Sequence, residues 1–549
     1  MAPSAFETHD VYNQPPQLPV RNVFETDPIL YGALEAALDE TGERLLSEHG
    51  GFWGTAEARE LARLANAHPP QLRTHDGQGR RIDLVEYHPA YHALMRRSAE
   101  AGLGISIWQA DREDDSGRAH AMRSARLYMT AQTECSHLVP WTTTCAAAGI
   151  ALVAPEFAEP WMSRIAGRRY DHRPQPAASK AGLTLSLALT EKQGSVPGVD
   201  NLTQASRFEG RRYRLIGHKW AMSGPMADAL IVLADAAGGP SVFLVPRFRR
   251  DESLNRVRIQ RLKETIGLRG NGIAEVEFAD AEAHLIGAEG DGAKLVADAH
   301  LTLRHDAAVM ATGVMRGALA NAVHHVRHRA SGGTRLLDKP LMARVLADMA
   351  IDVAAATALV IRLANARDRA ASDVIEDAIA RLMIPVAKFW IGRVAPMIAA
   401  EALECQGING YTESSEAARA YRDAQAFGIW GGASNQLALE ALSMIESVPE
   451  TLDAVLGDVT AVLGREASAS AEAIRGAANA CMDDPGSARI FVEQLAITTA
   501  AAALHRFAPR AITDAFIDTR LAGGWRASYG MLDARFDARG IVDYTYPAS

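Results

Sequence analysis

The chain has 549 residues, a formal net charge of −9 and 48% apolar residues. This composition is ordinary for a soluble globular protein and excludes a disordered, fibrous or disulfide-rich chain. The negative balance repels polyanions, so any nucleic-acid site would have to be a local patch.

The first third of the chain is expected to be mainly helical. Its first 30 residues are rich in Pro and Asn, which is typical of a loop. From there to about residue 180, apolar residues recur at spacings of three and four, as in amphipathic helices. The longest uncharged run, 138–155, contains threonines and prolines and indicates a buried helix rather than a membrane span.

The pattern changes near Leu183, where short segments rich in β-formers alternate with Gly, Pro or charged turns. Long helical patterns return after about residue 290 and favour a helix bundle. After about 450 the chain is Ala-rich with weaker periodicity. The sequence therefore predicts four units: an N-terminal helical domain (1–182), a central antiparallel β domain (183–290), a C-terminal four-helix bundle (291–445) and a helical tail extension (446–549).

The cysteines suggest neither a disulfide framework nor a metal site. The four of them form no CxxC pair, and no His/Cys cluster has zinc-ligand spacing. The N-terminus has no basic start followed by an apolar run, so no signal peptide is predicted. A reducing cytoplasmic location is expected.

A series of motifs follows the predicted domain order. The β unit opens with Leu-Thr-Glu-Lys-Gln-Gly at 189–194, and Gly-His-Lys-Trp-Ala-Met-Ser follows at 217–223. Further motifs lie at 262–270 and 286–292. Together they resemble the acyl-CoA dehydrogenase superfamily. Four segments near the N-terminus are similar to its adaptive-response (AidB-like) branch: 11–15, 61–70, 77–81 and 88–90. The resemblance as a whole covers roughly residues 9 to 445.

The resemblance implies bound FAD and a homo-oligomer, either a tetramer or a dimer of dimers. Flavin rings need hydrogen-bond donors on rigid elements, and the pyrophosphate needs a guanidinium or backbone N–H groups. Arg329 matches the arginine that reaches the FAD pyrophosphate of a partner subunit, and Gly407, Gly410 and Tyr411 match a glycine-rich turn near the nucleotide. The remaining cofactor candidates are Thr190, Ser195, Ser223, Trp430 and Asn435. The alternative is that Thr190 and Ser223 are ordinary strand-end hydroxyls and Arg329 a surface charge.

Both positions where the family carries its catalytic base lack a carboxylate here. The usual aromatic-Glu-Gly motif reads Trp430-Gly431-Gly432, and the other known position is Leu303, before Arg304. Dehydrogenation of an acyl-CoA needs a base for the α-proton. The aromatic that usually covers the flavin matches Ala221, and a further family aromatic matches Gly332. Large-to-small changes at Ala221, Gly332 and Gly431 would enlarge a cavity unless other groups refill it.

Titratable residues follow Leu303, the second position that lacks the family's carboxylate. His305 and Asp306 come directly after Arg304, and histidine can exchange a proton near neutral pH. These three residues are the catalytic candidates, with Asp306 as the partner that orients His305. The alternative is that His305 is a helix-surface or capping imidazole.

Three functions remain open from the sequence. The first is an FAD-dependent oxidoreductase acting on a non-standard small organic or acyl substrate. The second is an AidB-like flavoprotein of the DNA alkylation response, and the third is an oligomeric scaffold without FAD. From residue 451 the tail has nine Arg and no Lys against twelve Asp and Glu, which makes DNA an unlikely partner. A local patch would have to come from the tail arginines: Arg506, Arg510, Arg520 and Arg526.

Overall fold

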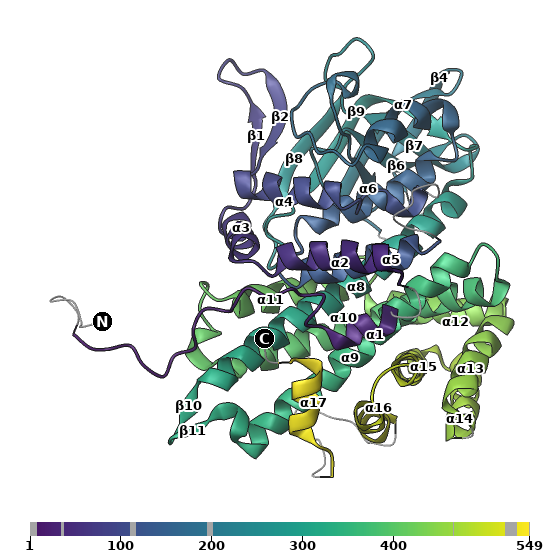
Figure 1. Ribbon diagram of the computed structural model, residues 1–549. Helices are drawn as coiled ribbons and strands as arrows, with labels where there is room; N and C mark the ends of the chain where they lie inside the picture. The colour runs from purple at the N-terminus through teal and green to yellow at the C-terminus, as the bar shows by residue number, and fades with distance from the viewer. Residues whose placement is uncertain are drawn as a thin grey trace.

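The computed structural model describes residues 8–34, 38–109, 117–194, 201–464, 466–521 and 535–547. Figure 1 shows the β domain at one end, the long helices in the middle and the tail helices beneath them.

The N-terminal domain is helical except for one hairpin. Residues 30–50 were expected to be continuously helical, but two helices are described there. Asp39 begins the second by accepting a hydrogen bond from Gly42 N. The hairpin β1–β2 was not predicted, since its strands are short and half exposed around an Asp-Gly turn. The elements are α1 (Pro28–Leu34), α2 (Glu40–Trp53), α3 (Ala56–Ala67), β1 (Gln71–His75), β2 (Arg81–Glu86), α4 (Pro89–Glu100), α5 (Ala119–Ala131), α6 (Leu138–Ala151) and α7 (Pro155–Ala166).

The β domain is a mixed sheet and not the purely antiparallel one that was expected. β3 pairs with β6 in parallel, because the chain passes through β4 and β5 before it returns beside β3. β7 pairs with both β6 and β9, so the sheet curls closed around an apolar interior. The strands are β3 (Leu185–Ala188), β4 (Gln204–Glu209), β5 (Arg212–Ser223), β6 (Ala229–Ala236), β7 (Gly239–Pro246), β8 (Val257–Lys263) and β9 (Ile273–Ile286).

Three long helices form the bundle, as the periodicity predicted, with a shorter fourth helix against α10. Pro340 begins α9, where its missing N–H costs nothing. Asp373 caps α10 by accepting from Ile375 N at 2.9 Å. The helices are α8 (Gly292–His328), α9 (Pro340–Arg369), α10 (Val374–Glu404), α11 (Glu416–Ala424) and α12 (Ser434–Ser447); a short β10–β11 hairpin (Ala330–Ser331, Thr334–Arg335) follows α8.

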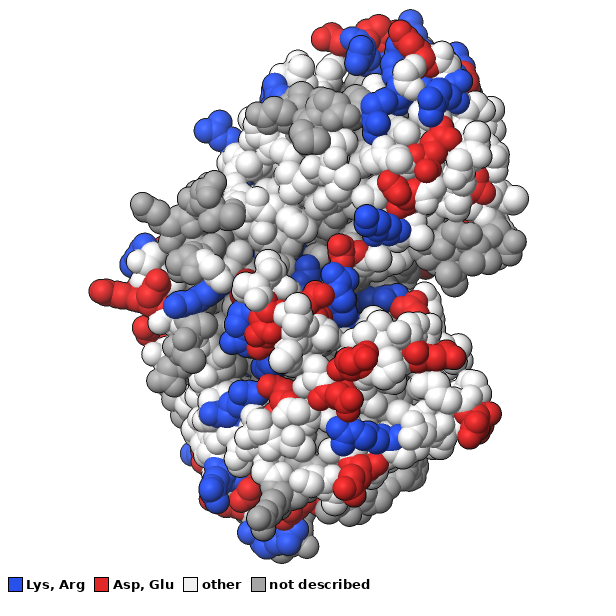
Figure 2. Space-filling model, turned by 90° about the vertical axis from the view of Figure 1, so that its right-hand side faces the viewer, with Lys and Arg blue, Asp and Glu red and all other residues white. Residues whose placement is uncertain are grey.

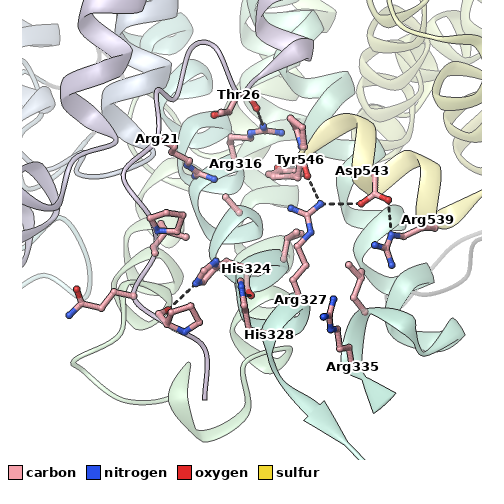
Figure 3. Close-up of a pocket in the computed structure, with 18 of the residues that line it drawn as sticks. Arg21, Thr26, Arg316, His324, Arg327, His328, Arg335, Arg539, Asp543 and Tyr546 are labelled. Atoms are coloured by element: carbon pink, nitrogen blue, oxygen red, sulfur yellow. Dashed lines mark hydrogen bonds and ion pairs between the residues drawn. The ribbon is translucent and has the colours of Figure 1, made fainter. Parts of the chain in front are cut away.

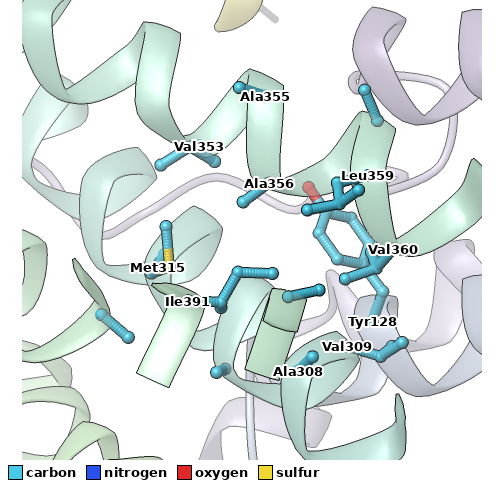
Figure 4. Close-up of a cluster of buried hydrophobic side chains, with 14 of the residues drawn as sticks. Tyr128, Ala308, Val309, Met315, Val353, Ala355, Ala356, Leu359, Val360 and Ile391 are labelled. Atoms are coloured by element: carbon cyan, nitrogen blue, oxygen red, sulfur yellow. The ribbon is translucent and has the colours of Figure 1, made fainter. Parts of the chain in front are cut away.

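Small side chains let the bundle helices approach closely. Figure 4 shows α9 alanines Ala355 and Ala356 in one apolar cluster with Tyr128 of α5 and Ile391 of α10. Among the described residues, only α10 is long and apolar enough to cross a membrane, and 78% of its most apolar window is buried. α10 is therefore a core helix of the bundle.

The tail packs onto the bundle rather than standing apart. α15 lies against α9 and α10, and α17 lies across α9 (Figure 1). A buried ion pair fastens it, with Arg520 2.6 Å from Asp348 and 2.7 Å from Asp352. The tail helices are α13 (Glu450–Leu463), α14 (Glu466–Asp483), α15 (Ala488–His505), α16 (Arg510–Phe516) with a π-helical turn to Leu521, and α17 (Ala538–Thr545).

Candidate functional site

The structure places the candidate residues in three groups, the first of which lies at one end of the sheet. Thr190 follows β3, and its carbonyl accepts a hydrogen bond from Trp220 N at 2.8 Å, which ties the Thr-Glu motif to β5. Ser223 ends β5 and is buried. Ala221, which we expected to match a flavin-covering aromatic, is exposed.

Asn271 is a further member of this group that the sequence did not reveal. Its amide nitrogen donates to Ser223 Oγ at 3.1 Å, and its side-chain oxygen is buried without a hydrogen-bond partner among the described residues. Gly272, at φ +49°, follows it, so in the sequence Asn271 resembles an ordinary turn residue. A buried, unpaired amide oxygen beside a hydroxyl suits a ligand that presents an N–H group, as a flavin ring does.

A buried ion pair holds this end of the sheet rigid. Glu191 of the motif accepts from Lys219 Nζ at 2.7 Å and from Thr203 Oγ1 at 2.6 Å. Burial raises the pKa of Glu191, but the bonds from Lys219 and Thr203 outweigh it and lower the pKa to about 2. Glu191 is therefore a structural carboxylate that fixes the loop carrying Thr190.

The second group lies where α8 meets the glycine loop before α12. Arg304 Nε donates to the Gly431 carbonyl at 2.9 Å, and its Nη1 pairs with Glu440 at 2.6 Å. These bonds bring Gly431 beside Leu303 and Arg304, so the two positions without a carboxylate are neighbours in space. Gly431 has φ +77°, a conformation that glycine favours.

Lys388 is the other residue that sequence reasoning missed at this point. It lies in the apolar run of α10, is 2% exposed and donates to the Gly432 carbonyl. Burial, together with the positive charge of Arg304, lowers its pKa to about 7. A lone lysine within an otherwise apolar helical run was the only signal in the sequence.

His305 and Asp306 point elsewhere, which corrects the expectation that they form a pair. Both Asp306 oxygens accept from Arg123, at 2.6 and 2.7 Å. His305 Nε2 faces the Val360 carbonyl at 2.9 Å, so that nitrogen carries the proton. Burial lowers the pKa of His305 to about 4. Successive helical residues project about 100° apart, and of these three catalytic candidates it is Arg304 that contacts the glycine loop.

The third group lies at the opposite end of α8. Arg329 donates to the Asn13 carbonyl, and Asn409, within the turn of Gly407 and Gly410, donates to Gln14 at 2.8 Å. The N-terminal segment thus bridges Arg329 and this turn. Between Arg304 and Arg329 the helix rises roughly 38 Å, so one flavin ring cannot touch both groups within a single chain.

Of the four remaining candidates, three take no part in these groups or only border them, and one lies outside the described residues. Trp430 packs between the bundle core and the cluster that contains Leu303. Asn435 accepts from Arg489 at 2.7 Å, and Tyr411 is 77% exposed. Ser195 lies outside the described residues.

Two of the four tail arginines, Arg506 and Arg520, are already paired with carboxylates. Arg520 is buried against its two aspartates, and Arg506 pairs with Asp458 at 2.7 Å. Arg526 falls outside the described ranges.

Figure 2 shows a hollow between the half of the molecule with the sheet and the half with the C-terminal helices, and basic side chains lie at its inner end.

The chain matches three family models in succession. They are the N-terminal domain of the adaptive response protein AidB over residues 13–172, the middle domain of acyl-CoA dehydrogenase over 186–281 and its C-terminal domain over 290–442. AidB of Escherichia coli (strain K12) is 39% identical over 466 residues, which cover 84% of this chain and 85% of the relative.

Solved structures share the fold at lower identity. ACDH-11 of Caenorhabditis elegans, solved in complex with C11-CoA, has a TM-score of 0.80 at 23% identity and covers 99% of this chain and 93% of its own. An acyl-CoA dehydrogenase of Bacillus anthracis, solved with FAD, has a TM-score of 0.65 at 16% identity and covers 93% of this chain and 85% of its own.

Proposed function

The chain belongs to the acyl-CoA dehydrogenase family, in its AidB branch, and we propose that it is an FAD-dependent oxidoreductase for a small organic or acyl substrate other than the straight-chain acyl-CoAs. The observation that carries the proposal is the contact between Arg304 and Gly431. It brings together both positions where the family keeps its base, and neither has a side chain that accepts a proton.

FAD fits the residues that the chain offers. The paired Ser223 and Asn271 present a hydroxyl and an unpaired buried amide oxygen to a ring. Arg329 and the Gly407–Gly410 turn would hold the pyrophosphate of the FAD bound by a second copy, which agrees with the distance along α8. When bound, FAD supplies a two-electron acceptor. We therefore propose a homo-oligomer, in the reducing environment that four free, buried cysteines suit.

The residues around the glycine loop can position a substrate and exchange a proton. Arg304 is a fixed cation beside Gly431, and Glu440 holds its guanidinium in place. Lys388, with a pKa of about 7, donates to the loop and changes charge near neutral pH. DNA is left out of the proposal, because Arg506 and Arg520 are already paired with aspartates.

The experiment compares wild type with Gly431→Glu and Gly431→Gln. A Cβ at this position would lie 3.6 Å from Arg304 Cγ, which is an ordinary contact. The positive φ strains both variants alike, so they differ only in the carboxylate. Each protein is first checked for a flavin spectrum and then assayed with short- and medium-chain acyl-CoAs and an artificial electron acceptor.

We expect little turnover by the wild type and a gain in Gly431→Glu that Gly431→Gln does not share. A positioned base is worth roughly 10²–10⁴-fold in rate. Wild-type turnover that equals the rate of a family member with the usual glutamate, measured in parallel, would contradict the proposal. A purified protein without flavin would contradict it at an earlier step.

A further inference from the structure

A large cavity lies at the C-terminal end of α8, away from Arg304. Its volume is about 700 Å³, and it is lined by the N-terminal segment 16–21, α8, the β11–α9 connection and α17 (Figure 3). Ligand pockets commonly have volumes of roughly 300–1,000 Å³. Its walls carry five arginines: Arg21, Arg316, Arg327, Arg335 and Arg539.

Arg316 has a structural role that accounts for its charge. It pairs with the buried Asp27 at 3.1 Å and donates to the Thr26 carbonyl at 3.0 Å. Its guanidinium also lies 3.6 Å from the centre of the Tyr546 ring. These contacts join α8 to the N-terminal segment and to the end of α17.

Arg327 and Arg539 are likewise compensated. Arg327 is 3.1 Å from Asp543, and Arg539 is 2.6 Å from the other oxygen of the same carboxylate. Arg539 also pairs with Asp338 at 3.0 Å. Three of the five arginines are thus matched by three aspartates.

Arg21 and Arg335 are not matched. Neither guanidinium makes an ion pair or a hydrogen bond within the described part of the chain, and both line the cavity (Figure 3). Burial and the nearby charge of Arg316 lower the pKa of Arg21 to about 10, which is still far above neutrality. Neither arginine therefore has a direct ion-pair partner within the described part of the chain, although the charge of Asp27 acts on Arg21 from a distance.

The rest of the wall is mixed. His324 and His328 lie on the same face of α8 with ring centres 4.5 Å apart. Leu18, Val323 and Leu337 supply apolar surface. A ligand that suits this wall carries anionic groups toward Arg21 and Arg335 and an organic body beside them (Figure 3).

We propose that this cavity binds a phosphorylated small molecule, whose anionic groups compensate Arg21 and Arg335. Guanidinium and phosphate form charge-assisted, often bidentate hydrogen bonds. A volume of about 700 Å³ suits a small molecule. The site is separate from the flavin candidates, because Arg329 and the Gly407–Gly410 turn do not line it.

The test uses the full chain with its flavin and inorganic pyrophosphate as the probe. Binding is measured by titration calorimetry at constant ionic strength for wild type, Arg335→Gln, Arg21→Gln and Arg393→Gln. Arg335 and Arg393 are both exposed, but only Arg335 lines the cavity, so Arg393→Gln is the matched control. Flavin content is recorded for each variant.

We expect saturable binding that weakens about tenfold in Arg335→Gln and in Arg21→Gln, and is unchanged in Arg393→Gln, with the flavin content equal throughout. The proposal is overturned by the absence of saturable binding or by an equal loss in Arg393→Gln. Loss of flavin in Arg335→Gln would assign the cavity to the cofactor instead. A duplex oligonucleotide that binds where pyrophosphate does not would also overturn it.

Discussion

Replacing Lys388 by methionine should change how the stability of the protein depends on pH. In the folded state its pKa falls to about 7 from an ordinary value of 10.5, because the ammonium group is buried and Arg304 is near. Between those two values the unfolded chain binds one proton more than the folded chain, so the free energy of unfolding rises with pH. Below about pH 7 both states are protonated, and this dependence disappears.

The size of the effect follows from the shift. One pKa unit corresponds to about 1.4 kcal/mol, and the slope reaches this value only well above pH 7, where Lys388 is fully deprotonated in the folded state. From pH 7 to pH 9 the stability of wild type relative to Lys388→Met should therefore rise by roughly 2 kcal/mol. The hydrogen bond to the Gly432 carbonyl is lost in the variant, at a cost of about 1 kcal/mol that adds a nearly constant offset.

The assay is urea unfolding at pH 6, 7, 8 and 9 at one protein concentration, followed by circular dichroism. Lys294→Met, in the exposed first turn of α8, is the control and should run parallel to wild type. Parallel curves for wild type and Lys388→Met between pH 7 and 9 would refute the reasoning. They would mean that Lys388 stays protonated in the folded state, and that it cannot serve as a proton acceptor near neutral pH.

Three other substitutions test the remaining assignments. Arg329→Ala should lower the flavin-to-protein absorbance ratio after dialysis, because a pyrophosphate loses a charge-assisted partner; an effect no larger than that of Arg393→Ala would contradict the assignment. Asn271→Ala should also reduce flavin retention, and should destabilise the flavin-free protein by only about 1 kcal/mol; unaltered retention would exclude it as a flavin contact. Arg520→Ala removes the guanidinium that faces two buried aspartates and should cost about 3–5 kcal/mol in urea unfolding; a loss below 1 kcal/mol would show that this ion pair does not stabilise the packing of the tail.

The architecture could be predicted because its signals are local or come as motifs in a fixed order. The patterns of α8, α9 and α10 were each continuous over 30 residues or more, and the motifs of the β unit carried the family resemblance. The parallel pairing of β3 with β6 could not be predicted, because the residues of a strand do not indicate which other strand it will pair with. β4 was missed because five of its six residues are exposed or polar, so it lacks an apolar alternation.

The candidate site was only partly predictable for a related reason. Thr190 and Ser223 stood out through motifs, whereas Asn271 and Lys388 become conspicuous only through burial and through the groups they face. The pairing of His305 with Asp306 was wrong because sequence adjacency was taken for contact. Neighbouring residues on a helix point in different directions. The partner of Asp306 is instead Arg123 of α5, which tertiary packing brings beside it.

The length of α8 links cofactor binding to assembly. This helix carries Leu303 and Arg304 near one end and Arg329 at the other, with roughly 38 Å between the two arginines. If one FAD needs both groups, they must come from different copies, and each copy stabilises the cofactor site of the other. Binding that requires assembly also strengthens assembly, because the two equilibria are linked.

Dilution should then release flavin over the same concentration range in which the oligomer dissociates, as followed by flavin fluorescence and by light scattering or sedimentation. Added FAD should move both transitions to lower protein concentration. Flavin that stays bound to the dissociated monomer would mean that the Arg329 group has no part in holding it.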